Sequence, residues 1–391
     1  MTAPSPLLNR HGAVAASGPD EGVAAHYGSP VPEQRALEAG RAVVDLSHYA
    51  VVTVSGPDRL SWLTTLSSQQ VAGLKPGESS ELLLLDISGR IEQAPAITDD
   101  GETAWLITEA SHGAALAEWL DSMKFTLRVE IADRTAEYAV LGSAAPLPES
   151  VESPAAWTDP WPQLAPGAES YSAVAEEEHP GADWAWHLTV VPRRQVEEAI
   201  ASLEAAGTSL AGMWAYEALR IAAWRPRLAQ DVDAKAIPHE LDLIRTAVHL
   251  SKGCYKGQET IARVHNLGHP PRRLVFLHLD GSEHTLPAPG AEVLAPKDPG
   301  DRDSLAKERS VGVVTSAARH HEAGPIALAL VKRKVDTEAQ LVVRHRPPQE
   351  EGSEEPPEPA FYAAGQELIV RPDAGQAVGR PQGDFLRGRP R

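Results

Sequence analysis

Six short strand-like segments occupy the last third of the chain, separated by turns and without the 3.6-residue period of a helix. They cover Leu274–Leu279, Glu292–Leu294, Val311–Thr315, Ile326–Val331, Gln340–Val343 and Glu367–Val370. Short strands with this spacing are typical of a small closed antiparallel sheet. The sequence therefore predicts a C-terminal β-barrel domain over residues 271–371.

The preceding residues 26–270 alternate between strand-like and helix-like segments. Strands are predicted at Val51–Ser55, Leu82–Leu85, Trp105–Thr108 and Trp184–Val191. Helices are predicted around Leu60–Leu66 and Leu116–Met123, from Pro192 to a C-terminal Gly207, and over Gly212–Trp224. In the helices, apolar residues recur at i, i+3, i+4 and i+7. This order predicts an α+β fold with two interleaved ferredoxin-like subdomains, followed by the barrel.

Three segments have the composition of solvated chain. Residues 1–25 are expected to form a disordered leader, residues 347–359 an acidic Pro-rich insertion in the barrel, and residues 372–391 a disordered tail. Neither a signal-peptide pattern nor an apolar run of the ~20 residues that a membrane helix needs is present. We therefore expect a cytoplasmic protein without a membrane partner.

Charge and cysteine count exclude several kinds of site. The formal net charge is −18, which argues against bulk nucleic-acid binding, because that depends on Lys and Arg neutralising phosphates. The single cysteine excludes an intramolecular disulfide and a zinc site built on paired cysteines. Adjacency does not place His320 and His321 on one metal ion, so no metal site is expected.

A basic, glycine-rich segment stands out at residues 252–273. It carries Lys252, Lys256, Arg263, Arg272 and Arg273 against Glu259, which is five minus one, a net charge of +4. Such a loop suits an anionic ligand with an aromatic ring, which Tyr255 could stack against. Cys254 has two interpretations here: a thiolate favoured by the flanking lysines, or a small buried apolar side chain.

The run Lys252-Gly253-Cys254-Tyr255-Lys256-Gly257-Gln258-Glu259 resembles the signature of the YgfZ family, folate-binding relatives of the glycine-cleavage T-protein. Residues 26–30, 44–48 and 54–58 also resemble T-protein segments, in the same order. The resemblance implies tetrahydrofolate or a derivative as cofactor and Cys254 as a reactive or ligating thiol. It assigns cofactor contacts to Tyr49, Tyr216, Lys252, Gly253, Tyr255, Gly257, Gln258, Glu259 and Arg263.

Two departures from the family pattern affect the chemistry. T-proteins carry acidic residues, one of them catalytic, where this chain has Gln93 and Ala94. Relatives also place a glutamate facing the pterin where this chain has Ala222. Without these carboxylates general acid–base help is lost, so the chain is not expected to be an active aminomethyltransferase.

The resemblance implies an accessory protein that binds folate and supports the assembly or repair of iron–sulfur enzymes, including enzymes that modify tRNA. Iron–sulfur enzymes or their assembly factors are then the expected partners. One alternative is a folate-dependent one-carbon transferase acting on a small amine. A second alternative is a non-catalytic interaction scaffold whose folate site has decayed, and Ala222 is its main support.

Overall fold

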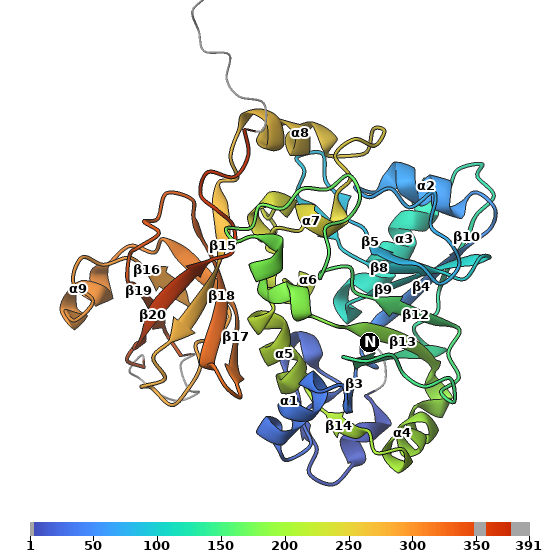
Figure 1. The fold of residues 1–391 in the computed structure, drawn as a ribbon, viewed down its shortest axis with the longest axis horizontal. Helices are drawn as coiled ribbons and strands as arrows, with labels where there is room; N and C mark the ends of the chain where they lie inside the picture. Colours follow the sequence, from blue (N-terminus) through green and yellow to red (C-terminus); the bar gives the residue numbers. More distant parts are fainter. Residues whose placement is uncertain (1–3, 348–356, 377–391) are drawn as a thin grey trace, which may run out of the picture.

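The computed structural model describes residues 4–347 and 357–376. Figure 1 shows a barrel on one side, two sheets with their helices on the other, and helices α5 and α6 between them. The helices are α1 (Pro30–Glu38), α2 (Arg59–Leu66), α3 (Gly113–Met123), α4 (Val196–Ala205), α5 (Met213–Ala222), α6 (Leu228–Asp231), α7 (Ile244–Ala247), α8 (Gln258–Leu267) and α9 (Arg302–Lys307).

Two five-stranded sheets form the first part of the molecule. One has the order β10 (Glu130–Asp133), β4 (Ala50–Ser55), β9 (Thr103–Thr108), β8 (Ala96–Asp99), β5 (Ser79–Glu81). The other has the order β12 (Ala155–Thr158), β13 (His187–Pro192), β11 (Tyr138–Ser143), β3 (Ala42–Asp45), β14 (Ser209–Ala211). The second sheet takes strands from before and after the first in sequence, which confirms the predicted interleaving. Small pairings join β1 (Val14–Ala15) to β2 (Ala24–His26) and β6 (Leu84–Leu85) to β7 (Ile91–Gln93).

The C-terminal barrel is closed and its strand pairs are antiparallel, as predicted. Its order is β15 (Arg272–Leu279), β18 (Gly324–Lys332), β17 (Gly312–His320), β16 (Glu292–Leu294), β19 (Leu341–His345), β20 (Ala360–Leu368). Closure leaves no free edge along the sheet. Strand β20 begins earlier than expected because its first residues follow the Pro/Glu run and look like part of it. Helix α9 was not predicted.

Local sequence explains the helices that cover the sheets. In α4, Val196, Ile200 and Leu203 lie on one face and are buried, as the spacing predicts. Helix α5 is buried on nearly all sides, because it contacts α1 and β3 as well as barrel strand β17. It therefore forms the main contact between barrel and sheets.

The expected leader over residues 1–25 is wrong for residues 4–25. Leu7 is fully buried in the apolar cluster with Val43 and Leu141, and Asp20 is buried beside Arg227. This segment looked mobile because its contacts are with residues far along the chain, which leave no local periodicity. Most of the insertion and of the tail (348–356 and 377–391), with residues 1–3, lies outside the described residues. No helix in the described ranges is long and apolar enough to cross a membrane.

Candidate functional site

An inner cavity of about 90 Å³ lies where both sheets meet the chain that follows α5. Half of its lining residues are aromatic or charged: Tyr49, Trp157, Trp186 and Tyr216, with Glu81, Glu109, Asp159, Arg225 and Arg227. Most of the others are apolar, Ala94 among them. It is large enough for several water molecules, since one needs about 10–15 Å³. A buried, polar cavity of this kind is a candidate binding site.

The aromatic residues form a stack along one wall. The rings of Trp186 and Tyr216 are 4.7 Å apart at an interplanar angle of 28°, and Trp184 continues the stack at 5.4 Å from Trp186. Trp184 and Trp186 are two residues apart in the segment just before β13, which begins at His187. Burial raises the pKa of Tyr216 to about 12. Both Tyr216 and Tyr49 line the cavity, so the structure brings together these two predicted site residues.

Two arginines that the sequence analysis did not select, Arg225 and Arg227, hold the charged side of the inner cavity. Arg225 donates to Glu81 (2.7 Å) and to Asp159 (3.0 Å). Arg227 donates to Glu109 at 2.8 Å. Burial opposes the charge of Arg227, but Glu109 and the other nearby acidic groups raise its pKa well above the ordinary value. All three cavity carboxylates are therefore paired with a cation, and a paired carboxylate is a poor general base.

The three residues at which the sequence departs from the T-protein pattern it resembles lie in two places. Ala94 lines the inner cavity, where its side chain supplies no carboxylate. Gln93 is next to it, and its Oε1 is buried without a hydrogen-bond partner among the described residues. Ala222 instead lines a separate small cavity of about 190 Å³ with Trp184, Trp186 and His320, which we call the small cavity.

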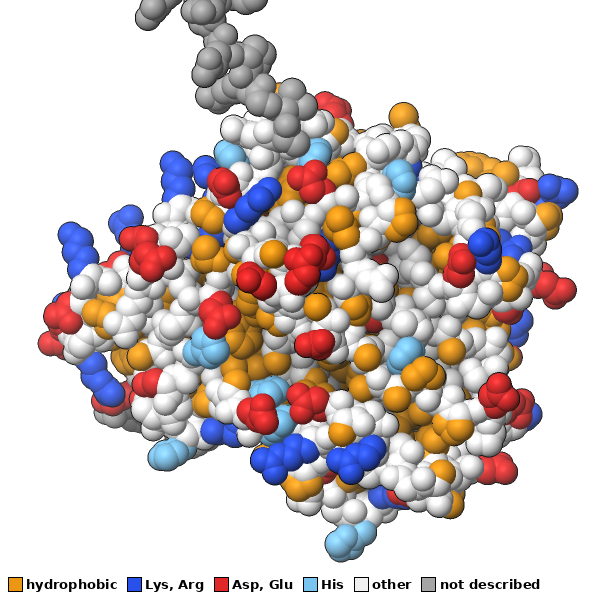
Figure 2. Space-filling view, viewed as in Figure 1, with side chains coloured by type: hydrophobic (Ala, Val, Ile, Leu, Met, Phe, Trp, Pro, Cys, Tyr) orange, Lys and Arg blue, Asp and Glu red, His pale blue; other side chains and the backbone are white. Residues whose placement is uncertain are grey.

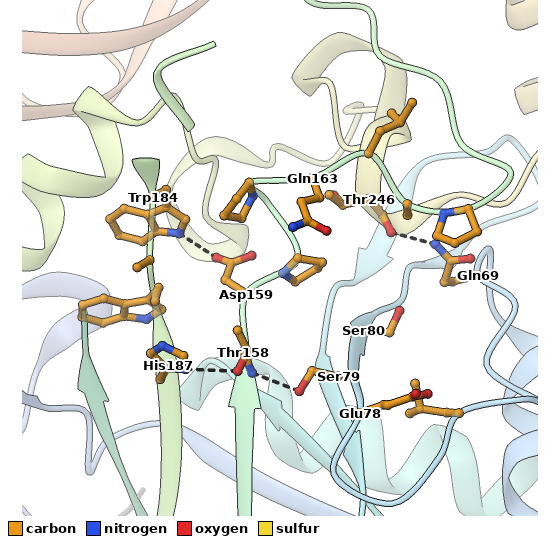
Figure 3. A pocket seen from close by; sticks show the side chains of 18 of the residues that line it. Gln69, Glu78, Ser79, Ser80, Thr158, Asp159, Gln163, Trp184, His187 and Thr246 are labelled. Carbon is orange, nitrogen blue, oxygen red and sulfur yellow. Dashed lines mark hydrogen bonds between the residues drawn. The ribbon is translucent and has the colours of Figure 1, made fainter. Parts of the chain in front are cut away.

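An outer groove of about 950 Å³ opens beside the inner cavity and shares Asp159 and Trp186 with it. Figure 3 shows its polar side chains: Trp184 donates to Asp159 (2.9 Å), Gln69 donates to the carbonyl of Thr246 (2.7 Å), and Thr158 lies 3.0 Å from His187. Ligand sites typically measure about 300–1,000 Å³. The groove is in that range, and the inner cavity alone is smaller.

The Cys254 loop lies apart from these cavities. None of Lys252, Gly253, Cys254, Tyr255, Gly257, Gln258, Glu259 and Arg263 lines the inner cavity, the outer groove or the small cavity as described. The structure therefore does not bring this loop together with Tyr49 and Tyr216. The expected arrangement, a thiol beside a folate-sized pocket, is not the one observed.

Most charges of this loop are used within the protein. The Lys252 ammonium donates to the carbonyls of Thr64 and Ser67 at the end of α2 and lies 4.6 Å from the centre of the Tyr255 ring. Burial lowers its pKa to about 8. Lys256 pairs with Glu92 (3.1 Å). Both lysines that flank Cys254 in sequence therefore have partners within the protein.

The remaining members of the loop have structural places. Tyr255 is buried in the core, Gly257 has a positive φ of 85° at the start of α8, and Gln258 begins that helix. Arg263 pairs with Glu259 on the exposed surface of α8 (3.0 Å). Cys254 itself is exposed, so the alternative of a small buried apolar side chain is wrong.

His320 and His321 do come together with Glu38, at the contact between α1 and the barrel. Their rings stack at 4.6 Å, and His321 Nε2 lies 2.9 Å from Glu38. His320 Nδ1 accepts the backbone N–H groups of Glu322 and Ala323. A metal-ligating histidine normally donates from its second nitrogen, so these contacts favour a hydrogen-bonded pair of rings over metal ligation.

Comparison with known proteins finds a family model that matches the first part of the chain, and relatives that are similar over most of it. Residues 11–155 match the GCVT N-terminal domain. An aminomethyltransferase of Streptomyces coelicolor is 26% identical over 323 residues, covering 78% of this chain and 82% of that protein. A putative chloroplastic transferase of Arabidopsis thaliana is 26% identical over 329 residues, covering 81% of this chain and 71% of that protein.

The fold agrees with the GCVT match. The crystal structure of the glycine cleavage system aminomethyltransferase T from Bartonella henselae superposes with a TM-score of 0.66 over 93% of this chain and 94% of that chain, at 18% identity. The chain thus has the T-protein fold and aminomethyltransferase-like relatives.

Proposed function

We propose that this chain binds a folate-type ligand, a reduced pteridine such as tetrahydrofolate, at the inner cavity and outer groove. The observation that carries the proposal is the Trp186–Tyr216 stack facing Arg225 and Arg227 in a T-protein fold. An aromatic wall suits the flat pteridine ring, and paired arginine and carboxylate groups suit its polar edge. Because the inner cavity holds about 90 Å³, the rest of the ligand occupies the outer groove.

We further propose that the chain does not transfer aminomethyl groups. Ala94 stands in the cavity where transferases have a carboxylate, and Glu81, Glu109 and Asp159 are each paired with an arginine. No cavity carboxylate in the described part of the chain is then free to move a proton. The relatives' names favour a transferase, which is the second candidate. Methylene-tetrahydrofolate formed from an aminomethylated lipoyl carrier would establish that candidate and overturn ours.

The binding proposal is tested by calorimetry with tetrahydrofolate. Tyr216→Leu removes one ring of the stack and should weaken binding about fivefold, since an aromatic pair contributes roughly 0.5–1.5 kcal/mol. Tyr138→Leu is the matched control, because Tyr138 makes an edge-to-face contact with Trp105 and lines none of the four described cavities. Absence of heat at millimolar tetrahydrofolate, with folded protein, would end the proposal.

The accessory role in iron–sulfur enzyme assembly or repair, including tRNA-modifying enzymes, is part of the same proposal. Its support is the exposed Cys254 within the signature that resembles the YgfZ family. An exposed thiol on a surface loop can reach a partner protein, which a buried one cannot. Iron–sulfur enzyme activity in cells should fall with Cys254→Ser and stay unchanged with Ser251→Ala, an exposed neighbour. Equal activity in both variants would remove the role.

A cytoplasmic location remains part of this proposal. The plant relative is named as chloroplastic, and that location belongs to the relative. Fractionation of the source cells would test it.

A further inference from the structure

The cavities that surround the inner cavity share an unusual charge pattern. The outer groove is lined by Glu78, Asp159 and Asp183, and none of its described lining residues is Lys or Arg. The small cavity is lined by Glu38 and Asp183, again with neither basic residue among its described lining. The part of a ligand that extends from the inner cavity into the outer groove therefore lies among carboxylates, with no lysine or arginine among the described lining residues.

The pattern continues beyond the outer groove. A side groove of about 680 Å³ shares Gly77, Thr158 and His187 with it. Its charged lining residues, as far as the structure describes them, are acidic: Asp99, Asp100, Glu149 and Glu152. In Figure 2, Lys and Arg side chains lie mainly around the border of the face shown, while its central part carries acidic and apolar side chains.

Neighbouring cations offset part of this charge. Lys75 lies 3.9 Å from Glu78, Arg225 pairs with Asp159, and Arg59 pairs with Asp99 at 2.7 Å. Because Arg225 also pairs with Glu81, the cluster of Arg225, Glu81 and Asp159 has a net charge of −1. Asp183 forms no ion pair with any described residue. The lining of the outer groove and the side groove therefore keeps a net negative charge when these neighbouring cations are included.

Two histidines that line these spaces, His187 and His320, add little positive charge. Burial lowers the pKa of His187 in the outer groove, and burial, followed by the neighbouring His321, lowers the pKa of His320 in the small cavity. Both rings are therefore mostly neutral at pH 7. The basic segment at residues 252–273, which could have attracted an anion, lines none of these spaces.

We propose that this site selects pteridines with a short or uncharged tail and discriminates against oligo-γ-glutamyl tails. This inference rests on the proposed function and specifies its ligand class. Each added γ-glutamyl residue brings one more carboxylate to the outer groove and then the side groove. Like charges repel, and the repulsion between exposed groups is screened over about 10 Å at 0.1 M salt.

The experiment measures calorimetric affinities of three reduced ligands: tetrahydrofolate, its pentaglutamate, and 6-methyltetrahydropterin, which has no tail. We expect the pentaglutamate to bind about tenfold more weakly than tetrahydrofolate at low salt, an order-of-magnitude value. The difference should shrink toward none at 1 M salt, where the screening length is about 3 Å. The tail-less pterin should bind with an affinity that salt leaves unchanged.

Two charge-reversal variants locate the effect. Asp183→Lys places a cation in the lining of the outer groove. It should reduce the ratio of the tetrahydrofolate affinity to the pentaglutamate affinity about threefold. Glu130→Lys is the matched control: Glu130 is exposed on β10 and lines none of the described cavities, so the ratio should not change.

The outcomes separate this inference from the proposed function. Pentaglutamate binding as tightly as tetrahydrofolate, or more tightly, overturns the inference and leaves pteridine binding in place. An equal response to Asp183→Lys and Glu130→Lys also overturns it, because the selectivity would then not arise in the groove. If none of the three ligands binds to folded protein, the proposed function itself is wrong.

Discussion

Asp20 Oδ2 accepts a hydrogen bond from Arg227 Nη1 at 3.1 Å, across 207 positions of sequence. Both side chains are buried, and His48 approaches the other oxygen of Asp20 at 3.2 Å. Since Arg227 lines the inner cavity, the N-terminal segment supplies a counter-charge to the site. Burial alone would raise the pKa of Asp20, but Arg227 and His48 hold it below the usual value.

Asp20→Asn should lower the free energy of unfolding by about 2–3 kcal/mol. Removing one partner of a buried pair costs roughly 3–5 kcal/mol, and Glu109 and Glu217 still pair with Arg227, which reduces the loss. Urea unfolding at pH 7 measures the change. Asp121→Asn is the control, because its pair with Lys124 is exposed and should be worth less than about 1 kcal/mol. Equal losses would show that Asp20 has no special role.

Asp242→Asn should change how stability depends on pH. Burial raises the pKa of Asp242 to about 7, above the unfolded value of about 3.9. The folded state therefore binds the proton more tightly, and this carboxyl makes stability fall as pH rises from about 4 to about 7. Asparagine can keep the hydrogen bond from the Tyr171 N–H and tolerates the φ of 53°.

The free energy of unfolding of Asp242→Asn should exceed that of the wild type by roughly 2 kcal/mol at pH 8 and equal it near pH 4. The difference between the two unfolding curves isolates Asp242. It is needed because the buried His239, whose pKa is lowered to about 3 by burial, gives the opposite slope below pH 6.5. A difference that does not vary with pH would contradict the assignment.

Gly257→Ala should destabilise the protein by about 2 kcal/mol or more. Gly257 has φ 85°, and a Cβ there would lie 2.6 Å from the backbone oxygen of Asp86; the left-handed conformation alone costs a residue with a Cβ about 1–2 kcal/mol. Gly253→Ala is the matched change in the same loop, because a Cβ there meets nothing within 4 Å. The free energy of unfolding of Gly253→Ala should stay within about 0.5 kcal/mol of the wild-type value. Thermal unfolding of both variants tests the pair.

Cys254 should react with a maleimide in the native protein without denaturant, because its side chain is exposed. Cys254→Ser is the unlabelled control, and its free energy of unfolding should stay within about 0.5 kcal/mol of the wild-type value. Since Cys254 lines none of the four described cavities, saturating tetrahydrofolate should leave the labelling rate unchanged. Protection by the ligand would show that the loop reaches the binding site.

The fold was predictable where local pattern and final contacts agree. Val196, Ile200 and Leu203 face one way on any helix, so α4 followed from spacing. The barrel strands followed in the same way, although β20 was shifted by the neighbouring Pro/Glu run. Of the predicted strand at Leu82–Leu85, only Leu84 and Leu85 lie in a strand, β6, while β5 ends before this range at Glu81.

The site was less predictable because its residues meet from distant parts of the chain. The family resemblance selected Tyr49 and Tyr216, and both line the inner cavity. Arg225 and Arg227 were not selected, because no local pattern distinguishes them from surface arginines. The glycine-rich loop was selected because of its net positive charge. Lys252, however, donates to carbonyls at the end of α2, and no sequence pattern indicates that contact.

The pairing of Asp20 with Arg227 has a consequence for synthesis. A ribosome adding about 5–20 residues per second needs roughly 10–40 s to cover the 207 positions between them. During that interval the N-terminal segment has neither Arg227 nor strand β14, the parallel neighbour of β3. Until Arg227 has been made, the nascent chain therefore cannot bury Asp20 beside its cation, and Leu7 and Val43 lack the part of their apolar cluster that Leu203 and Leu210 supply.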